Sequence, residues 1–290
     1  MTISRRGFLQ VAGITLAASQ LGAFTPLAAL AEDAPLKGRV LEPVSLGGQA
    51  LWPDSVVRIL EADGERYRLA EGWVPRSAVQ PMFLDTRPTP MRAMPDYVEV
   101  SAPVAPIYQS ASTTAPLLAR IGHGGVLAVQ DSLRDSTGEI EWVGVQHKHK
   151  TGWVQAARVA AVEQAARFTF IMPPTDTRVV RLVVNRAQQT LTVSSGGQMV
   201  LTTPISTTTT KPLWSGQWGF WSTVPSQPAT DNEAYVKSWW LRANNGFELT
   251  GVYWHNAFGS PQPGPDIQLP MPVARWLYEA SAADTVLVVE

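Results

Sequence analysis

Two histidines of this 290-residue chain are spaced in a way that could form a metal site. His147 and His149 lie two positions apart, so on a β-strand both imidazoles would point to one face and could bind a metal ion. Lysines stand between and after them and repel a cation, and no third ligand is near in the sequence. We therefore expect a solvated hairpin tip here, a turn residue at His123, and no metal or other cofactor.

Cysteine is absent from the whole sequence. Its absence excludes disulfides, thiolate metal sites and every mechanism with a sulfur nucleophile. Lys and Arg number 23 against 24 Asp and Glu, which leaves a formal net charge of -1 and no basic excess to bind nucleic acid. With 45% hydrophobic and 16% charged residues, the chain suits one large domain or several small ones with buried cores.

Tryptophan is concentrated in the last part of the chain. Indole rings can stack on a sugar face or pack along an extended peptide. Trp218 and Trp276 are expected in a core. Trp239, Trp240 and Trp254 are candidates for the rim of a cleft, with a core position left open.

The N-terminus has the pattern of an export signal. Arg5 and Arg6 precede an apolar stretch, and small residues at 29–31 suit a signal peptidase, so residues 1–31 are predicted to be a twin-arginine signal. Polar residues and Pro26 dilute the apolar stretch, which makes it a poor membrane span. The mature chain is expected in the periplasm, the cell wall or outside the cell; whether the signal is cleaved or kept stays open.

Short runs of alternating apolar residues, separated by Gly and Asp, follow the signal. They occur twice and end each time in Gly-Trp-Val, at residues 72–74 and 152–154. This pattern is typical of small antiparallel barrels, and we expect one in residues 32–88 and a second in residues 89–165.

A longer domain is predicted over residues 178–290, after a linker at residues 166–177. It opens with a strand and hairpin that turn at residues 195–197, and it closes with a helix at residues 272–280 and a last strand. The expected fold class is mainly β, with one late helix.

The two short segments resemble bacterial Src-homology-3-like domains of the cell-wall type, the first as a divergent copy. The resemblance implies attachment to peptidoglycan or a spacer role. We expect Trp73 and Trp153 to be core aromatics in preference to ligand contacts. The motifs that carry the resemblance are APIY at 105–108, WVGV at 142–145 and TGWV at 151–154.

Residues 178–290 resemble the catalytic domain of the L,D-transpeptidase (YkuD-like) family. The resemblance implies a β-sandwich with a short helix. Active members cross-link or edit peptidoglycan stem peptides through an acyl-enzyme on a cysteine. The motifs that carry it lie at residues 184–191, 204–207, 215–218, 240–249, 251–259 and 274–278.

The catalytic groups of that family are missing at the positions that match them. Counting back from residues 274–278, the cysteine position is Asp266 and the two histidine positions are Gly264 and Thr250, while Gln268 takes the place of a basic or amide residue. A carboxylate that attacked an amide would have to form a mixed anhydride, which lies far uphill. No residue is therefore confidently catalytic, and the chain is expected to be a pseudoenzyme.

Two loops are expected to border the former site. Residues 207–211, mostly threonine, are predicted to be a surface loop. Residues 261–265 contain three prolines and should be stiff, which suits a binding surface.

The sequence thus predicts an exported envelope protein that binds a peptidoglycan stem peptide or glycan strand without cross-linking it, with other envelope proteins as further partners. No nucleic acid and no membrane span after signal removal are expected. A hydrolase that uses Asp266 as a general base with His255 stays open as the alternative, as does a module that binds only proteins. The expected ligand-binding residues are Trp239, Trp240, Tyr253, Trp254, His255, Asn256, Asp266 and Gln268.

Overall fold

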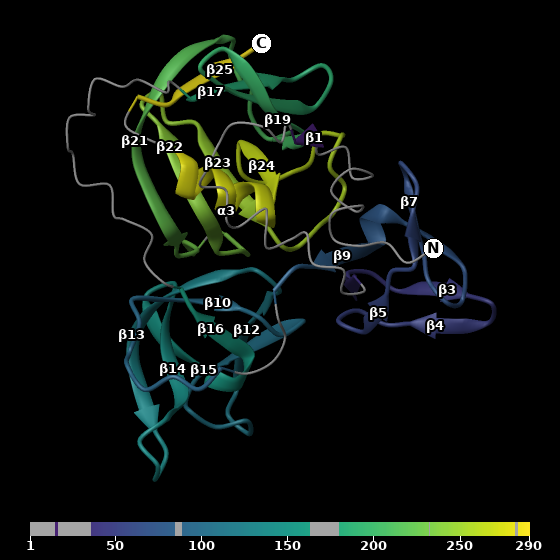
Figure 1. The fold of residues 1–290 in the computed structure, drawn as a ribbon. Coiled ribbons are helices and arrows are strands. Elements are labelled where there is room, and N and C mark those ends of the chain that lie inside the picture. The colour runs from purple at the N-terminus through teal and green to yellow at the C-terminus, as the bar shows by residue number, and fades with distance from the viewer. Residues whose placement is uncertain (1–14, 17–35, 85–88, 163–179, 232, 282–283) are drawn as a thin grey trace.

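The chain forms three β-rich parts in a computed structural model (Figure 1). The structure describes residues 15–16, 36–84, 89–162, 180–231, 233–281 and 284–290. The predicted linker at 166–177 and nearly all of the predicted signal lie outside these residues. None of the helices in the described part is long and apolar enough to cross a membrane.

The first part, residues 36–84, contains three small antiparallel sheets in the orders β5-β2-β9, β3-β4 and β6-β7-β8. Ile59, Tyr67 and Val74 are fully buried between them. Trp73 is 38% exposed, which corrects its expected core position, and the Arg66 guanidinium lies 5.1 Å from its ring. The elements are β2 (Lys37–Val40), β3 (Val44–Leu46), β4 (Gln49–Leu51), β5 (Val56–Arg58), β6 (Glu61–Ala62), β7 (Arg66–Arg68), β8 (Trp73–Pro75), η1 (Arg76–Ala78) and β9 (Val79–Met82).

The middle part, residues 89–162, is one seven-stranded sheet in the order β12-β11-β15-β14-β13-β10-β16. The turn between β14 and β15 is Lys148 and His149, at the tip expected from the sequence, and Lys148 has a positive φ of 52°. Trp153 is half-buried. The elements are β10 (Tyr97–Val100), β11 (Val104–Tyr108), β12 (Leu117–Gly122), β13 (Val126–Arg134), β14 (Ile140–His147), β15 (Lys150–Gln155), η2 (Ala156–Arg158) and β16 (Val159–Ala161).

The third part, from residue 180 onward, supplies nine strands of a ten-stranded sheet in the order β1-β19-β18-β17-β25-β21-β22-β23-β24-β20, and the two-residue strand β1 pairs with β19 at one end of it. Gly196 and Gly197 have φ of 57° and 78°, which is the backbone that a tight hairpin turn between β18 and β19 requires. The strands are β1 (Thr15–Leu16), β17 (Val180–Asn185), β18 (Thr190–Ser195), β19 (Gln198–Pro204), β20 (Ser206–Thr207), β21 (Gly216–Gln227), β22 (Lys237–Ala243), β23 (Glu248–Val252), β24 (Ile267–Pro270) and β25 (Val286–Val289).

The single α-helix of the described residues, α3 (Met271–Ala280), begins directly after β24 and packs on β22 and β23. Pro272 stands in its first turn, where a missing N–H costs nothing. A Cβ on Gly251 would lie 2.7 Å from the sulfur of Met271, so glycine lets the helix approach the strand closely. The expected mainly β fold with one late helix is confirmed; the domain boundaries and the kinship of the two smaller parts stay predictions.

Polar contacts join the middle part to the third. The backbone N–H of Val126 donates to the Ser238 hydroxyl at 2.9 Å, and the Ser226 hydroxyl donates to the Val126 carbonyl at 2.7 Å. Arg275 on α3 forms an ion pair with Glu99 on β10, with 2.8 Å between Nη1 and Oε2. Helix α3 is therefore fixed between the two parts.

Polar contacts also join the first part to the middle one. The guanidinium of Arg39 forms an ion pair with Asp54 of the same part at 3.0 Å, lies beside Gly122 and donates from Nη1 to the Pro103 carbonyl at 3.4 Å. Arg120 of the middle part forms a second ion pair with Asp54. His123 lies in the turn after β12, as expected, but is only 2% exposed; its Nε2 accepts hydrogen bonds from the backbone N–H groups of Phe83 and Leu84.

Candidate functional site

The predicted site residues lie where β20, β23 and β24 meet. Strand β24 runs parallel to β23 and antiparallel to β20. Asp266 comes immediately before β24 and Gln268 lies on it, opposite Thr250 of β23. The chain therefore brings Asp266 to the start of a buried strand.

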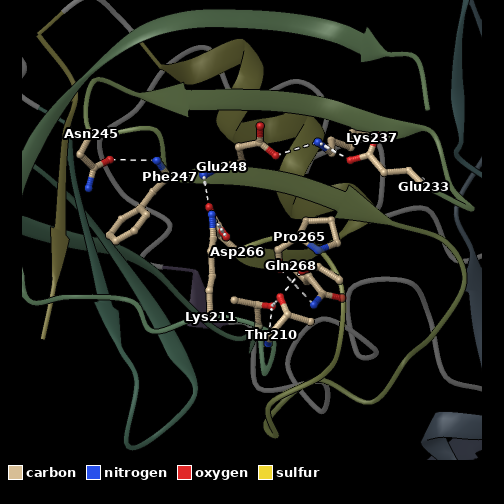
Figure 2. Close-up of polar contacts among 12 residues, drawn as sticks. Thr210, Lys211, Glu233, Lys237, Asn245, Phe247, Glu248, Pro265, Asp266 and Gln268 are labelled. Carbon is tan, nitrogen blue, oxygen red and sulfur yellow. Dashed lines mark hydrogen bonds and ion pairs between the residues drawn. The ribbon is translucent and has the colours of Figure 1, made fainter. Parts of the chain in front are cut away.

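Asp266 is held by an ion pair and a backbone hydrogen bond. Lys211 Nζ lies 2.8 Å from its Oδ1, and the N–H of Glu248 donates to Oδ2 at 3.2 Å. Figure 2 shows Lys211 and the Glu248 backbone against this carboxylate. Burial raises the pKa of Asp266, and the contacts with Lys211 and the Glu248 N–H oppose this effect. Both carboxylate oxygens thus have partners within the protein.

The charge of Glu248 is balanced on its other side. Lys237 Nζ lies 2.8 Å from Glu248 Oε2 and 2.8 Å from Glu233 Oε1, as Figure 2 shows. Burial opposes the charge of Lys237, but its hydrogen bonds to both carboxylates outweigh burial and raise its pKa. Lys237 therefore bridges two carboxylates, while Lys211 pairs with the third, that of Asp266.

His255 uses both ring nitrogens within the protein. Its Nδ1 accepts the N–H of Ala257 at 3.2 Å, so Nε2 must carry the proton, and Nε2 donates to Gln268 Oε1 at 2.7 Å. Burial lowers the pKa of His255, which keeps the ring neutral at neutral pH. The ring has no free lone pair with which to remove a proton.

Gln268 ties the proline-rich loop to β24. Its Nε2 donates toward the carbonyls of Gln262, Pro263 and Pro265, at 3.1, 3.4 and 3.2 Å. Those bonds orient the amide so that Oε1 faces His255. Gln268 is fully buried, so this residue supports the loop.

The threonine-rich segment packs onto the same loop. Thr207 and Thr208 are buried, which corrects their assignment to a surface loop. The Thr208 hydroxyl donates to the Gly264 carbonyl at 2.8 Å, and its N–H donates to the Asp266 carbonyl at 2.9 Å. Gly264 has a φ of 128°, a conformation that favours glycine. The loop geometry therefore favours glycine at residue 264.

Three of the aromatic candidates lie in the core instead of on a cleft rim. Trp239, Trp240 and Tyr253 are 1%, 6% and 2% exposed, so none can stack on a ligand in this structure. Trp254 is half-buried and stacks on Tyr235, with 4.3 Å between the ring centroids.

Thr250, which the sequence placed at a histidine position, is also buried, and its hydroxyl donates to the Ser238 carbonyl at 3.0 Å.

Asn256 joins the third part to the first. Its Nδ2 donates to the carbonyls of Arg76 and Val79 at 3.0 and 2.9 Å and lies 3.3 Å from the Tyr67 hydroxyl. The amide nitrogen of this predicted ligand-binding residue therefore binds the protein's own first part.

A cleft opens where these two parts meet. The volume in it that water-sized groups can occupy is about 30 Å³, and the cleft is partly open to solvent. Phe83 of the first part faces Phe258 and Met271 of the third across it, and His255 and Asn256 also line it. The sequence did not predict this cleft, because Arg76, Gln80, Pro81 and Phe83 are far away in the chain from the rest of its wall.

Sequence reasoning missed Lys211 and Arg76. Lys211 had a weak signal, because it ends the threonine run. Arg76 had none, because its place in the wall of the cleft depends on how two parts dock. Among the residues that the structure describes, no group of three or more His, Cys, Asp or Glu side chains could hold a metal ion.

No protein-family model and no curated protein matches the chain. Similar solved structures include an L,D-transpeptidase from Stackebrandtia nassauensis, with 17% identity and a TM-score of 0.36, which covers 43% of this chain and 62% of that one. One from Mycobacterium smegmatis has 17% identity and a TM-score of 0.34, and covers 55% and 76%. One from Mycobacterium tuberculosis H37Rv has 18% identity and a TM-score of 0.35, and covers 56% and 77%. The match to the first spans less than two thirds of that protein, and function must be argued from the site itself.

Proposed function

We propose that this chain is an exported cell-envelope protein that binds peptidoglycan without cross-linking it. One observation supports the claim that the chain does not cross-link peptidoglycan. Asp266, the residue at the predicted nucleophile position, is paired with Lys211 and the Glu248 N–H. In a chain without cysteine, no thiol can replace it.

The hydrogen bonds of the site also weigh against the hydrolytic alternative. A general base needs a lone pair directed at water. Asp266 is only 3% exposed and its carboxylate faces Lys211 and the Glu248 N–H, so little of it can reach water, and His255 has Nδ1 occupied by Ala257 and Nε2 by Gln268. The two residues thus have different partners and do not form an acid–base pair.

The binding half of the proposal is supported by the cleft and by the resemblance of residues 178–290. The cleft has apolar walls with a few polar groups, the usual character of a ligand site. Peptidoglycan is the polymer on which the resembling family acts, and the export pattern of residues 1–31 would place the chain where that polymer is found.

Retention on purified sacculi tests the proposal. We expect the mature chain to sediment with sacculi but not with insoluble chitin, and to leave the muropeptide profile unchanged by mass analysis. Asp266→Asn, which keeps the shape of the side chain, should be retained equally. New or shortened muropeptides that vanish in Asp266→Asn would refute the non-catalytic proposal, and failure to sediment would refute binding.

A further inference from the structure

The wall of the cleft carries one kind of charge. Among its described lining residues Arg76 is the charged side chain, and none is an aspartate, glutamate or lysine. His255, the other titratable lining group, is held neutral because burial lowers its pKa more than the hydrogen bond to Gln268 raises it. The cleft is therefore suited to an anion.

Arg76 is positioned without a counter-ion. It begins the short helix η1, donates from Nη1 to the Gly64 carbonyl at 2.9 Å and lies 5.8 Å from the ring of Tyr67. Three other arginines of the first part form ion pairs: Arg39 with Asp54, Arg66 with Asp63, and Arg68 with Glu61. No carboxylate among the described residues pairs with Arg76, and a guanidinium has five N–H donors, so donors remain for a ligand.

The rest of the wall suits the end of a peptide. Phe83, Phe258, Met271 and Val252 are apolar, as are the four prolines of the wall, and Gln80, Thr203 and Asn256 are its uncharged polar residues. Apolar walls also strengthen an ion pair by keeping water away. The Oδ1 of Asn256 forms no hydrogen bond with the described residues, so it can accept an N–H from a peptide.

We propose that this cleft binds the free carboxylate end of a short peptide, with Arg76 as the residue that determines specificity for the carboxylate. The inference rests on the proposed function, since it makes the peptide a peptidoglycan stem and not a glycan strand. The guanidinium of Arg76 binds the terminal carboxylate, and Asn256 accepts a peptide N–H from the opposite wall. A cleft that is partly open to solvent accommodates a chain end while the remainder of the polymer stays outside.

Calorimetric titration with two synthetic stem tetrapeptides tests this inference. One has a free C-terminal carboxylate and the other a C-terminal amide. We expect the wild-type chain to bind the free acid about tenfold more tightly, as one charge-assisted hydrogen-bonded pair would provide. Arg76→Gln should bind both peptides equally weakly, and Arg76→Lys should keep part of the preference because it keeps the charge.

Arg66→Gln is the matched control, because Arg66 is an exposed arginine of the same part and is paired with Asp63. It should leave both affinities unchanged, and thermal melting shows whether each variant is folded. The inference would be overturned if the wild type bound the two peptides equally, or if Arg76→Gln still preferred the free acid. In either case the proposed function would stand as long as the chain is retained on sacculi. Loss of both peptide binding and retention would overturn the proposed function too.

Discussion

The buried ion pair between Glu99 and Arg275 makes stability depend on pH. Glu99 is 6% exposed, and burial raises its pKa from 4.5 to about 7, although Arg275 and Trp239 act in the opposite direction. The pKa of Arg275 is raised instead, because its carboxylate partners outweigh its burial. The two partners differ because the side chain of Arg275 is 32% exposed and that of Glu99 only 8%. Burial therefore raises the pKa of Glu99 by more than the ion pair with Arg275 lowers it.

The direction in which stability changes with pH follows from where the folded and unfolded chains bind the proton of Glu99. The folded chain keeps a proton on Glu99 up to about pH 7, whereas the unfolded chain loses it near pH 4.5. The resulting stabilisation is fully present below pH 4.5 and is lost as the pH rises through about 7. At about 1.4 kcal/mol for each pH unit, this change amounts to about 3 kcal/mol at most.

Glu99→Gln removes this titration and keeps an oxygen that can accept from Arg275. We expect the free energy of unfolding of the wild type to fall between pH 4.5 and 7.5 by up to about 3 kcal/mol more than that of the variant. Above pH 7.5 the variant should be at least as stable as the wild type, because glutamine, like the protonated carboxyl, places no negative charge at this desolvated position. Urea unfolding followed by tryptophan fluorescence at several pH values measures both quantities.

Glu141→Gln is the control, since Glu141 is exposed on the same part of the chain. It should follow the wild type at every pH. If Glu99→Gln and the wild type have the same pH dependence, or if the variant is clearly less stable above pH 7.5, then Glu99 stays charged in the folded state and burial does not dominate its titration.

Other substitutions test the contacts between the parts and the site. Gly122→Ala should lower the melting temperature, because its Cβ would lie 1.5 Å from Nη1 of Arg39; overpacking of this kind costs about 1–3 kcal/mol, whereas Gly64→Ala, in open space, should cost little. Asn256→Ala should cost about 1–3 kcal/mol by urea unfolding and expose the first part to limited proteolysis, and unchanged cleavage would contradict its bridging role. Lys211→Met should destabilise the chain at pH 8 and have less effect at pH 4, because its buried carboxylate partner can then take up a proton; equal effects at both pH values would mean that the ion pair contributes nothing.

The fold was largely predictable from local patterns. Alternating apolar residues, the glycines at 196 and 197 and the late apolar helix each follow from backbone geometry and from burial of one face, which act over a few residues. The exposure of Trp73 and the burial of Thr208 were not predictable, because the same residue types occur on both sides of a sheet. Burial of a single side chain depends on what packs against it.

By itself, the sequence determined that no thiol chemistry is possible, since composition alone removes the nucleophile. Only the tertiary structure decided which polar side chains of the site have hydrogen-bond or ion-pair partners within the protein. Lys211 meets Asp266, and Asn256 meets Val79 from 177 residues away, through contacts that exist only once distant strands and separate parts have docked. A hydrogen bond of this kind has no local pattern to reveal it, because its partners are selected by the packing of the whole chain and not by their neighbours in sequence.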